Sequence, residues 1–442
     1  MVKTPSFLRA CRWLVPVLLA SAAAAQDTGS TDLEKLVREQ GEMIRRLQGE
    51  VDRMSRESSA LLEHDVEEYL TATEPRTREQ MPSSVGGTPM WGQRVKLGGY
   101  FTFQYRDDGE GIPVEFNFLR LVPKLQAQIA EGITFETEIE IEGGGVGPEF
   151  LTDSEILVEY AELTFMFIED KLDLVAGLIL LPWGRYNLYH DDPLNDLPDR
   201  PLVSRYIGSV AAQQPGVGVQ GTLEPGSGWF LDYDVALVQG FHDGFSTEDG
   251  VRPARPSFRE DNNDNKQLFG RVAVTPPVGF VDVCEIGGSF TYGEWDADGD
   301  LNDYGWGVDV FVKKGHFRFT GEYMWFRIDQ PAGAPATEPQ RQNGWYAEAA
   351  YDFFPATWRG KHVLLTDEST FTLVVRVEAL DLNEATDGTT FRDDISQVSV
   401  GFCFRPVRRT VLKVSYAFVN SDLTGFGNGE ADTFVIEWST YF

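Results

Sequence analysis

The sequence predicts an all-β fold, a transmembrane antiparallel β-barrel of about 16 strands preceded by a short N-terminal coiled-coil helix. The last nine residues, 434–442, alternate large apolar side chains such as Phe434, Ile436 and Trp438 with smaller or polar ones. A strand in that position can pair with the first strand and close the sheet, which removes its edges. The alternative is an ordinary sheet strand that happens to end the chain.

Strand-like alternation continues from residue 94 to residue 442. Phe317 and Phe319, for example, fall on one face of a strand with Arg318 on the other, and Arg376 likewise faces away from its apolar neighbours. Segments of this kind begin near residues 95, 115, 132, 155, 171, 215, 229, 267, 281, 304, 315, 343, 370, 393, 409 and 431. An even number of strands is typical of bacterial outer-membrane barrels.

The connections between these segments alternate in length. Tight links such as 131–132, 169–170 and 313–315 alternate with long polar links, and the long set is 184–214, 242–266, 295–303, 330–342, 383–392 and 421–430. Short turns on one side and long loops on the other are expected of a transmembrane barrel, whereas a soluble β-sandwich or propeller gives no reason for the alternation. The link 354–369 is longer than this rule allows, so a strand could be miscounted there.

The region before the barrel divides into three parts. Residues 1–25 combine basic residues, a short apolar stretch and small residues before Gln26, which predicts a signal peptide. Residues 26–63 place leucines and methionines at heptad positions, which predicts a periplasmic coiled-coil helix; a solitary amphipathic helix is the alternative. Residues 64–93 contain three prolines and little periodicity and are predicted to be a linker, so the barrel spans 94–442.

Composition limits the classes of function. The net charge is −31, which argues against nucleic acid as a partner and against a basic patch for anionic lipid. No apolar run is long enough for a transmembrane helix, so contact with outer-membrane lipid must come from strands. Beyond the predicted signal peptide only Cys284 and Cys403 remain, which is too few for a disulfide framework.

Three segments together resemble a known family. They are 116–124 (FNFLRLVPK), 155–163 (EILVEYAEL) and 175–187 (VAGLILLPWGRYN), and Pro182-Trp183-Gly184 is the most specific part. The series resembles the phosphate-selective porin O/P family, including diverged acidic members, over most of 94–442. The terminal Phe442 also resembles the assembly signal of bacterial outer-membrane barrels. The resemblance implies a sixteen-stranded, trimeric porin of the bacterial outer membrane with one loop folded into its lumen.

Strand parity gives candidate pore-lining residues. Glutamates alternate with apolar residues from 135 to 142, so their carboxylates form a ladder on the water-facing side, and the preceding strand carries Arg120 and Lys124 on its polar face. The ladder consists of Glu136, Glu138, Glu140 and Glu142. Facing acidic and basic groups set a transverse field and filter solutes by charge. The alternative is that these charges only keep the inner wall hydrated. Arg318 and Arg376 are also predicted to line the pore.

The link 184–214 is predicted, by analogy with the family, to be the loop that narrows the channel. It contains arginines and aspartates, of which Arg185, Arg200, Arg205, Asp191 and Asp192 are candidate constriction residues. Arginine suits anion binding because its guanidinium offers several donors. Pairing of these arginines with the loop aspartates is equally compatible with the sequence. The basic ladder of phosphate-selective members is not traceable here, so phosphate specificity does not follow.

Other motifs give weaker evidence of function. Residues 296–303 (DADGDLND) resemble a calcium loop, but the glycine and the expected glutamate are misplaced, so a solvated acidic loop is the simpler interpretation. The histidines are scattered singly, and no nucleophile–base or zinc spacing is present. We therefore predict no catalytic residues, no metal site and no cofactor.

The sequence as a whole predicts a porin: a homotrimeric diffusion channel of the bacterial outer membrane for small hydrophilic solutes or inorganic ions, with phosphate or other anions implied only by the resemblance. Two alternatives are a barrel-housed enzyme, such as a lipase or protease, and a cell-wall tether that uses the coiled coil. Acidic residues outnumber basic ones 69 to 38, but exposed loop charges are screened and should count little. At the predicted constriction, Arg185, Arg200 and Arg205 nearly balance Asp191, Asp192, Asp196 and Asp199, while the Glu136–Glu142 ladder makes the inner wall negative. We therefore expect weak ion selectivity with a slight preference for cations.

Overall fold

The computed structural model describes the barrel region of the chain, with short gaps; its ranges are 95–109, 113–143, 155–209, 211–256, 258–259, 261–335, 338–384, 394–421 and 432–442. The predicted signal peptide, coiled-coil helix and linker (1–93) lie outside the described residues. No helix in the described part is long and apolar enough to cross a membrane.

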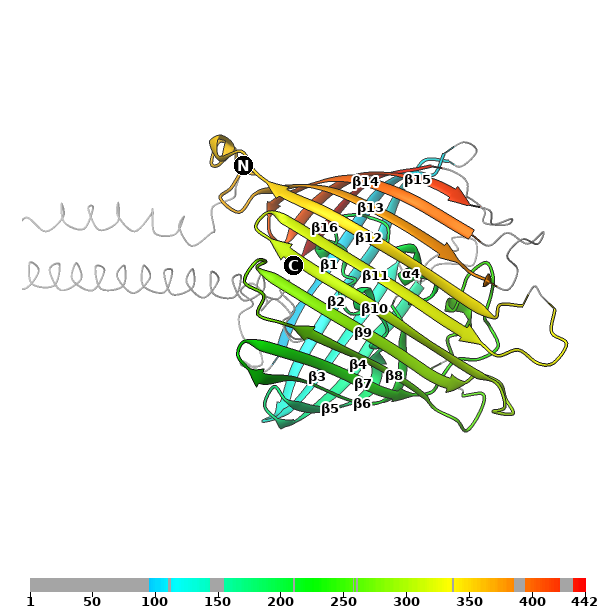
Figure 1. Ribbon diagram of the computed structural model, residues 1–442. Helices are drawn as coiled ribbons and strands as arrows, with labels where there is room; N and C mark the ends of the chain where they lie inside the picture. Colours follow the sequence, from blue (N-terminus) through cyan, green and yellow to red (C-terminus); the bar gives the residue numbers. More distant parts are fainter. Residues whose placement is uncertain are drawn as a thin grey trace, which may run out of the picture. The chain divides into compact units, whose positions relative to one another are not determined.

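The described residues form one closed antiparallel barrel in which each strand pairs with its neighbours in sequence (Figure 1). The strands are β1 (Val95–Asp107), β2 (Glu115–Ala130), β3 (Ile133–Glu142), β4 (Glu155–Ile168), β5 (Leu172–Leu180), β6 (Gln213–Gly226), β7 (Trp229–Val238), β8 (Gln267–Thr275), β9 (Val283–Glu294), β10 (Asn302–Lys314), β11 (Phe317–Ile328), β12 (Arg341–Phe353), β13 (Thr370–Asp381), β14 (Asp394–Val407), β15 (Thr410–Ser421) and β16 (Thr433–Tyr441). The predicted fold class is confirmed, and each predicted strand start lies within two residues of the observed one.

Short helices occupy some of the connections. They are α3 (Arg185–Leu188), η2 (Asp192–Leu194), α4 (Leu202–Tyr206), η3 (Arg252–Ala254) and η4 (Ala356–Trp358). The first three lie between β5 and β6. The long link between β12 and β13 contains η4 and no additional strand, so the strand count there is correct.

Closure depends on the last strand. β16 pairs with both β15 and β1, and its register with β1 joins Tyr100 to Tyr441 and Phe103 to Trp438. The backbone N–H of Phe442 adds a hydrogen bond of 2.9 Å to the carbonyl oxygen of Gly99. Every strand therefore has two partners, as a sheet in lipid requires, because hydrocarbon offers no hydrogen bonds to a free edge.

The two faces of the wall differ in chemistry. Large apolar side chains such as Val308, Leu373 and Val375 are exposed on the outer face. Polar or charged residues of alternate parity, including Glu437 and Arg376, are buried on the inner face. This arrangement matches a barrel with lipid outside and a polar lumen, which places the protein in the bacterial outer membrane. The short turns then mark the periplasmic end and the long connections the extracellular end.

The wall chemistry predicts a depth-dependent penalty for charge on the outer face. Val375→Arg, at the middle of β13, should destabilise the barrel by about 2–4 kcal/mol because the guanidinium would lie in hydrocarbon. Val95→Arg, at the periplasmic start of β1, should cost only about 0–1 kcal/mol. Folding into vesicles over a urea series measures both. Equal costs at the two positions would contradict the assignment of the outer face.

Candidate functional site

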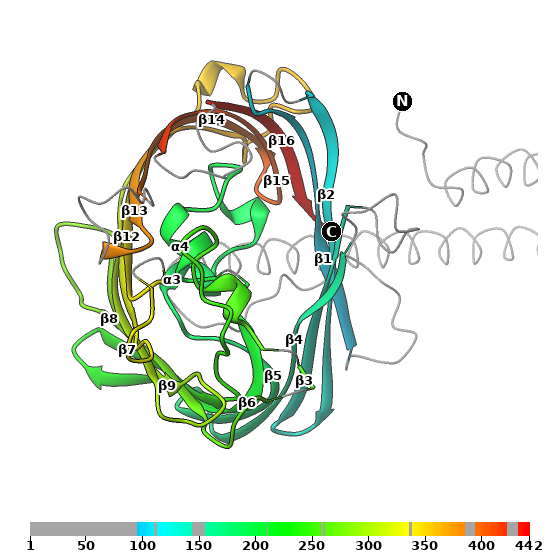
Figure 2. The ribbon, with the colours of Figure 1, turned by 90° about the vertical axis from the view of Figure 1, so that its right-hand side faces the viewer.

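Residues 181–212, which we call the inner loop, leave the wall after β5 and fold inside the barrel before β6 begins (Figure 2). The two ends of the loop are tied together, since the N–H of Leu181 donates to the carbonyl oxygen of Ala212 at 2.9 Å. Asn187 reinforces this closure with hydrogen bonds from Nδ2 to the carbonyl oxygens of Leu181 (2.8 Å) and Ala212 (3.1 Å). The loop is thus a closed unit within the lumen.

The segment Pro182-Trp183-Gly184 turns the chain inward. Trp183 is buried, and its Nε1 donates to the carbonyl oxygen of Ile207 at 3.0 Å, near the far end of the loop. Gly184 has a φ of 80°, and a Cβ at this position would collide with Oε1 of Glu322. Glycine therefore lets the backbone approach this carboxylate, which accepts a hydrogen bond of 3.0 Å from the N–H of Arg185.

One side of the inner loop packs as an apolar core against the wall. Val203 and Ile207 are fully buried in a cluster that includes Phe269, Phe326 and Leu380 of the inner wall. Inward-facing residues near the extracellular ends of β8, β11 and β13 are therefore apolar because the loop covers them. Contact with the wall is extensive enough that the loop cannot lift away without exposing this core to water.

The other side of the loop is held by charge. Asp191 accepts from Nζ of Lys124 at 2.7 Å and from the hydroxyl of Tyr441 at 2.9 Å. Asp192 lies 3.3 Å from Nε of Arg120, and its carbonyl oxygen accepts from Nζ of Lys413 at 2.7 Å. These contacts join η2 to β2, β15 and β16.

Asp196 and Asp199 extend the attachment to other strands. The carboxylate of Asp196 bridges Arg318 of β11 (2.7 Å) and Arg405 of β14 (2.8 Å). Asp199 pairs with Arg106 of β1 at 2.8 Å, and its carbonyl oxygen accepts from Arg376 of β13 at 2.8 Å. The loop aspartates therefore pair with arginines and lysine of the wall, a pairing that the sequence did not predict.

The wall cations also control the ionisation of the loop carboxyls. Burial alone would raise the pKa of Asp196, but the guanidinium groups of Arg318 and Arg405 outweigh burial and lower its pKa below the ordinary value. The pKa of Asp199 is lowered in the same way, against burial, by Arg106. Burial followed by the nearby Arg200 lowers the pKa of His190, whose Nε2 lies 3.4 Å from Oε1 of Glu159 on β4.

The predicted glutamate ladder of β3 meets its predicted partners. Lys124 pairs with Glu138 at 2.7 Å, and Arg120 pairs with Glu140 at 2.8 Å and with Glu142 at 3.1 Å. The remaining member, Glu136, accepts a hydrogen bond from Gln126. Because Arg120 and Lys124 also hold Asp192 and Asp191, the ladder belongs to the attachment of the inner loop.

The structure separates Arg185 from the other two predicted constriction arginines. Its guanidinium pairs with Glu285 of β9 at 2.7 Å and lies over the rings of Tyr189 (4.5 Å) and Phe311 (4.8 Å). Glu285 in turn pairs with Arg271, which also binds Asp309. Arg185 therefore fastens α3 to the wall and does not line the cavity that contains Arg200 and Arg205.

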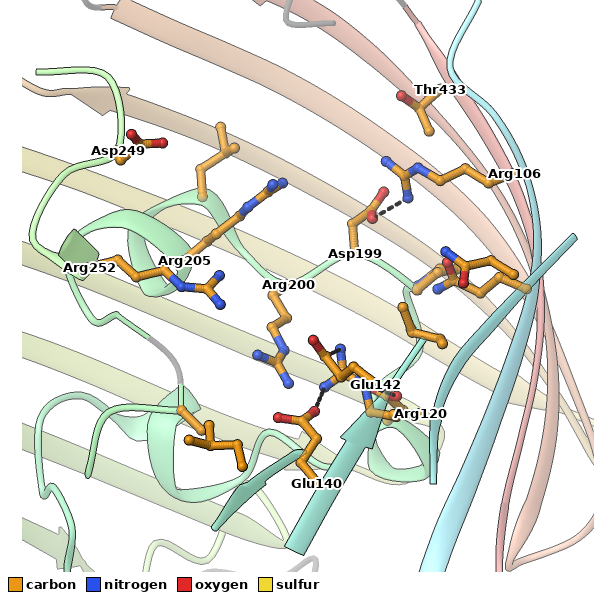
Figure 3. A pocket seen from close by; sticks show the side chains of 18 of the residues that line it. Arg106, Arg120, Glu140, Glu142, Asp199, Arg200, Arg205, Asp249, Arg252 and Thr433 are labelled. Carbon is orange, nitrogen blue, oxygen red and sulfur yellow. Dashed lines mark hydrogen bonds and ion pairs between the residues drawn. The ribbon is translucent and has the colours of Figure 1, made fainter. Parts of the chain in front are cut away.

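A cavity of about 900 Å³, which we call the vestibule, lies beside the inner loop. It is lined by residues of β1, β2 and β3 on one side and by the inner loop and the β7–β8 connection on the other, as Figure 3 shows. Of the predicted site residues, the lining includes Arg120, Glu140, Glu142, Asp192, Arg200 and Arg205. Lys124, Glu136, Glu138, Arg185, Asp191, Arg318 and Arg376 do not line it.

The sequence analysis missed several charged residues of this site, namely Arg106, Glu159, Arg252, Arg255, Glu285, Arg405 and Lys413. Strand parity puts Lys413 and Arg405 on the polar faces of β15 and β14, so this pattern could have found both. No local signal marks Arg252 and Arg255, because they lie in the long connection between β7 and β8 and reach the vestibule only through the fold.

Two weaker motifs have structural explanations. Oδ1 of Asp296 accepts backbone hydrogen bonds from Asp300 (2.9 Å) and Leu301 (2.8 Å), so the acidic segment forms a turn around its own carboxylate. Within the described part of the chain, no group of three or more acidic, histidine or cysteine side chains is placed to hold a metal ion. Cys284 and Cys403 are not joined, and Sγ of Cys403 donates to the carbonyl oxygen of Asp196 at 2.8 Å.

Comparison with known proteins supports the fold. No family model matches the chain. A curated protein of Aquifex aeolicus (strain VF5), described as uncharacterized, is 28% identical over 184 residues, so the chain spans about 40% of the length of the curated relative it matches. The solved structures include Salmonella typhi OmpF in complex with daunomycin, with a TM-score of 0.51, 10% identity and coverage of 79% of this chain and 97% of that one. The barrel has the fold of the outer-membrane porins.

Pseudomonas putida OprB gives the same result, with a TM-score of 0.51, 8% identity and coverage of 79% of this chain and 94% of that one. At these identities the likeness concerns the fold alone. The function of the lumen therefore depends on this chain's own residues, above all on those of the vestibule and the inner loop.

The ion pairs of Asp196 give a direct test of loop attachment. Asp196→Asn leaves Arg318 and Arg405 without their shared carboxylate and should weaken the attachment by about 3 kcal/mol, because breaking a buried pair strands a charge. Cys403 reports the result, since its thiol is fully buried beside Asp196. In a chain with Cys11 and Cys284 changed to Ser, Cys403 should react with a water-soluble thiol reagent roughly a hundredfold faster in the Asp196→Asn variant.

Asp298→Asn, in the exposed connection between β9 and β10, is the matched control and should leave the reaction rate of Cys403 unchanged. Equal reactivity of Cys403 in the Asp196→Asn variant and its parent would show that the apolar packing alone holds the loop.

The lowered pKa values of Asp196 and Asp199 set the pH range of loop attachment. Their contribution is complete above the ordinary Asp pKa of 3.8 and is lost as the pH falls through the lower pKa of the folded state. We therefore expect the current noise of single channels in planar bilayers to be the same at pH 7 and pH 5 and to rise only below about pH 4. A rise between pH 7 and pH 5 would instead show that groups other than Asp196 and Asp199 control the attachment.

Proposed function

We propose that the protein is an outer-membrane porin through which small hydrophilic solutes and ions diffuse passively. The observation that carries the proposal is the polar vestibule of about 900 Å³ inside a closed barrel whose outer face is apolar. Charged groups line both sides of the vestibule. A hydrated cavity of this size admits small polar solutes, while its charged lining disfavours apolar ones.

The charges of the vestibule are unevenly distributed. On the wall side, Arg106 and Arg120 pair with Asp108, Glu140 and Glu142, and also with Asp199 and Asp192 of the inner loop, so carboxylates outnumber arginines around them. On the loop side, four arginines face the cavity, and these are Arg200, Arg205, Arg252 and Arg255. The acidic lining residues on this side are Glu248 and Asp249, together with Asp192 and Asp199, which pair with Arg120 and Arg106 of the wall. Figure 3 shows Arg205 and Arg252 across the cavity from Arg106 and Arg120.

This separation of charge supports a transverse electric field across the solute path. The sequence analysis predicted such a field between the glutamate ladder and its basic partners, but in the structure different groups contribute its positive side. The glutamate ladder contributes through its ion pairs with Arg120, and the opposing positive side comes from the inner loop and from η3. Such a field orients dipolar solutes and gives small net discrimination between cations and anions, since both signs of charge line the same cavity. We therefore propose weak ion selectivity, with no single solute such as phosphate strongly preferred.

Further features of the function rest on the family resemblance. We propose a homotrimer, which electrophoresis of the unheated, chemically cross-linked protein can test. The two alternative functions, a barrel-housed enzyme and a cell-wall tether, require no conduction. Steady conductance of the purified protein in planar bilayers would therefore support a porin over both, and its absence would favour one of them.

The positive side of the vestibule should control ion selectivity. Arg205 and Arg252 make no salt bridge to a described residue, so their charge acts on the solute path. In the double variant Arg205→Glu, Arg252→Glu we expect the cation-to-anion permeability ratio to rise about twofold or more, most clearly at low salt, where screening is weak. Reversal potentials across a salt gradient measure the ratio.

Lys266→Gln is the matched control, because Lys266 lies in the same connection as Arg252 but pairs with Asp261 and does not line the vestibule. An unchanged ratio in the double variant would place the selectivity elsewhere. Strong anion preference in the unmodified protein, with phosphate block of chloride current, would favour the phosphate-selective function instead of weak selectivity.

A further inference from the structure

One periplasmic connection is much longer than closing a hairpin requires. Residues 354–369, which we call the periplasmic turn, join β12 to β13, whereas the neighbouring turns at 315–316 and 408–409 are tight. Short turns at this end are the rule for outer-membrane barrels. In Figure 1 the turn, with its helix η4, lies at the same end as the other short turns and extends beyond the wall. The extra residues therefore serve something other than strand connection.

The turn packs against the lipid-facing side of the wall through aromatic rings. The ring of Trp358 meets that of Phe371 edge-on at 5.9 Å, and Phe354 stacks on Phe371 at 5.1 Å. Phe371 has the same strand parity as the exposed Leu373, so it belongs to the outer face. Phe371 also contacts Phe402 (5.4 Å) and Phe404 (5.1 Å) of β14.

The turn is thereby continuous with an aromatic belt at the periplasmic end of the wall. Aromatic rings at this level lie at the boundary between headgroups and acyl chains. The distal part of the turn also presents apolar side chains at its surface, since Val363 and Leu364 are 77% and 50% exposed. Exposed aliphatic side chains next to an interfacial aromatic cluster are placed to enter lipid rather than water.

Basic side chains flank these apolar residues. Arg359 and Lys361 are exposed in the turn, and the guanidinium of Arg359 lies over the ring of Phe354 at 4.8 Å. Four more cations lie at the adjacent hairpins, since Lys313 and Lys314 end β10 and Arg408 and Arg409 form the turn between β14 and β15. The acidic residues among these three turns are Asp367 and Glu368. Cationic side chains therefore outnumber acidic ones in this sector, although the whole chain has a net charge of −31.

The first three periplasmic turns have the opposite character. They carry Glu131, Glu169 and Asp170, with Lys171 as the single basic residue, and Glu224 lies beside the third turn near the end of β6. The basic sector is therefore local and coincides with the aromatic turn. Cations next to an apolar interfacial segment complement the phosphates of anionic lipid, and each contributes about 1 kcal/mol near such a surface.

We propose that the periplasmic turn is an anchor that binds anionic phospholipid in the periplasmic leaflet of the outer membrane. Trp358, Val363 and Leu364 enter the boundary between headgroups and acyl chains, and Arg359 and Lys361 contact the phosphates. The anchor fixes the depth of the β12–β14 side of the barrel. Lipid binding by the anchor does not require conduction, so a test of the anchor is independent of a test of the proposed channel.

Quenching of tryptophan fluorescence by brominated lipid tests the anchor in the full-length protein. The protein is reconstituted into phosphatidylcholine vesicles that contain equal mole fractions of either brominated phosphatidylglycerol or brominated phosphatidylcholine. The difference between the parent and a Trp358→Phe variant isolates Trp358 from the other nine tryptophans among the 10 in the chain. We expect this difference signal to be quenched about threefold more strongly by the brominated phosphatidylglycerol, because the basic side chains enrich anionic lipid around it.

Charge variants distinguish recognition of anionic lipid from mere closeness of Trp358 to any lipid. Arg359→Gln with Lys361→Gln keeps the aromatic cluster and should bring the quenching ratio close to one. Lys171→Gln, in the turn between β4 and β5, removes an exposed periplasmic cation elsewhere and should leave the ratio at about three. Equal quenching of Trp358 by both lipids in the parent would overturn the proposal of anionic recognition. Absence of quenching by either lipid would overturn the anchor itself and indicate that water or a second copy of the chain covers the turn.

Discussion

Every other feature of this structure depends on closure of the sheet between β1 and β16. In hydrocarbon an unpaired strand edge has no hydrogen-bond partner, so the sheet must close on itself. Closure creates an interior that is separate from the lipid, and this interior accepts charged side chains that the outer face cannot carry. The inner loop has a place to fold because the wall encloses it. The vestibule is the part of the lumen that the loop leaves open.

The inner loop combines two kinds of attachment, and they act on different parts of the wall. Its apolar residues pack against inward-facing rings such as Phe269 and Phe326, and its aspartates pair with wall cations such as Arg318 and Lys124. Buried ion pairs contribute little net stability over apolar packing, but removing one partner is costly. They are therefore better suited to fixing the position of the loop than to stabilising the barrel. A fixed loop in turn gives the vestibule a constant shape and charge distribution.

Net charge proved a poor guide to local chemistry. The chain is strongly acidic, yet arginines concentrate on the loop side of the vestibule, and basic residues concentrate near the periplasmic turn. Screening limits the reach of exposed charges to about 10 Å, so a solute or a lipid senses the nearby residues rather than the total. The expectation of a slight cation preference rested on the glutamate ladder of β3. It weighs less now, because Glu138, Glu140 and Glu142 are paired with Lys124 and Arg120.

The sequence by itself determined the barrel, its strand starts and the two faces of its wall. These features follow from local rules, since alternation within a strand and turn chemistry between strands involve residues that are neighbours in the chain. It also placed Arg120 and Lys124 opposite the glutamates of β3, because a hairpin brings such residues together. Tertiary structure alone decided the partners of the inner loop: Asp196 meets Arg318 and Arg405, which are far from it in sequence. No local pattern encodes such a contact, because it depends on the path of the loop through an interior that exists only once the barrel has closed.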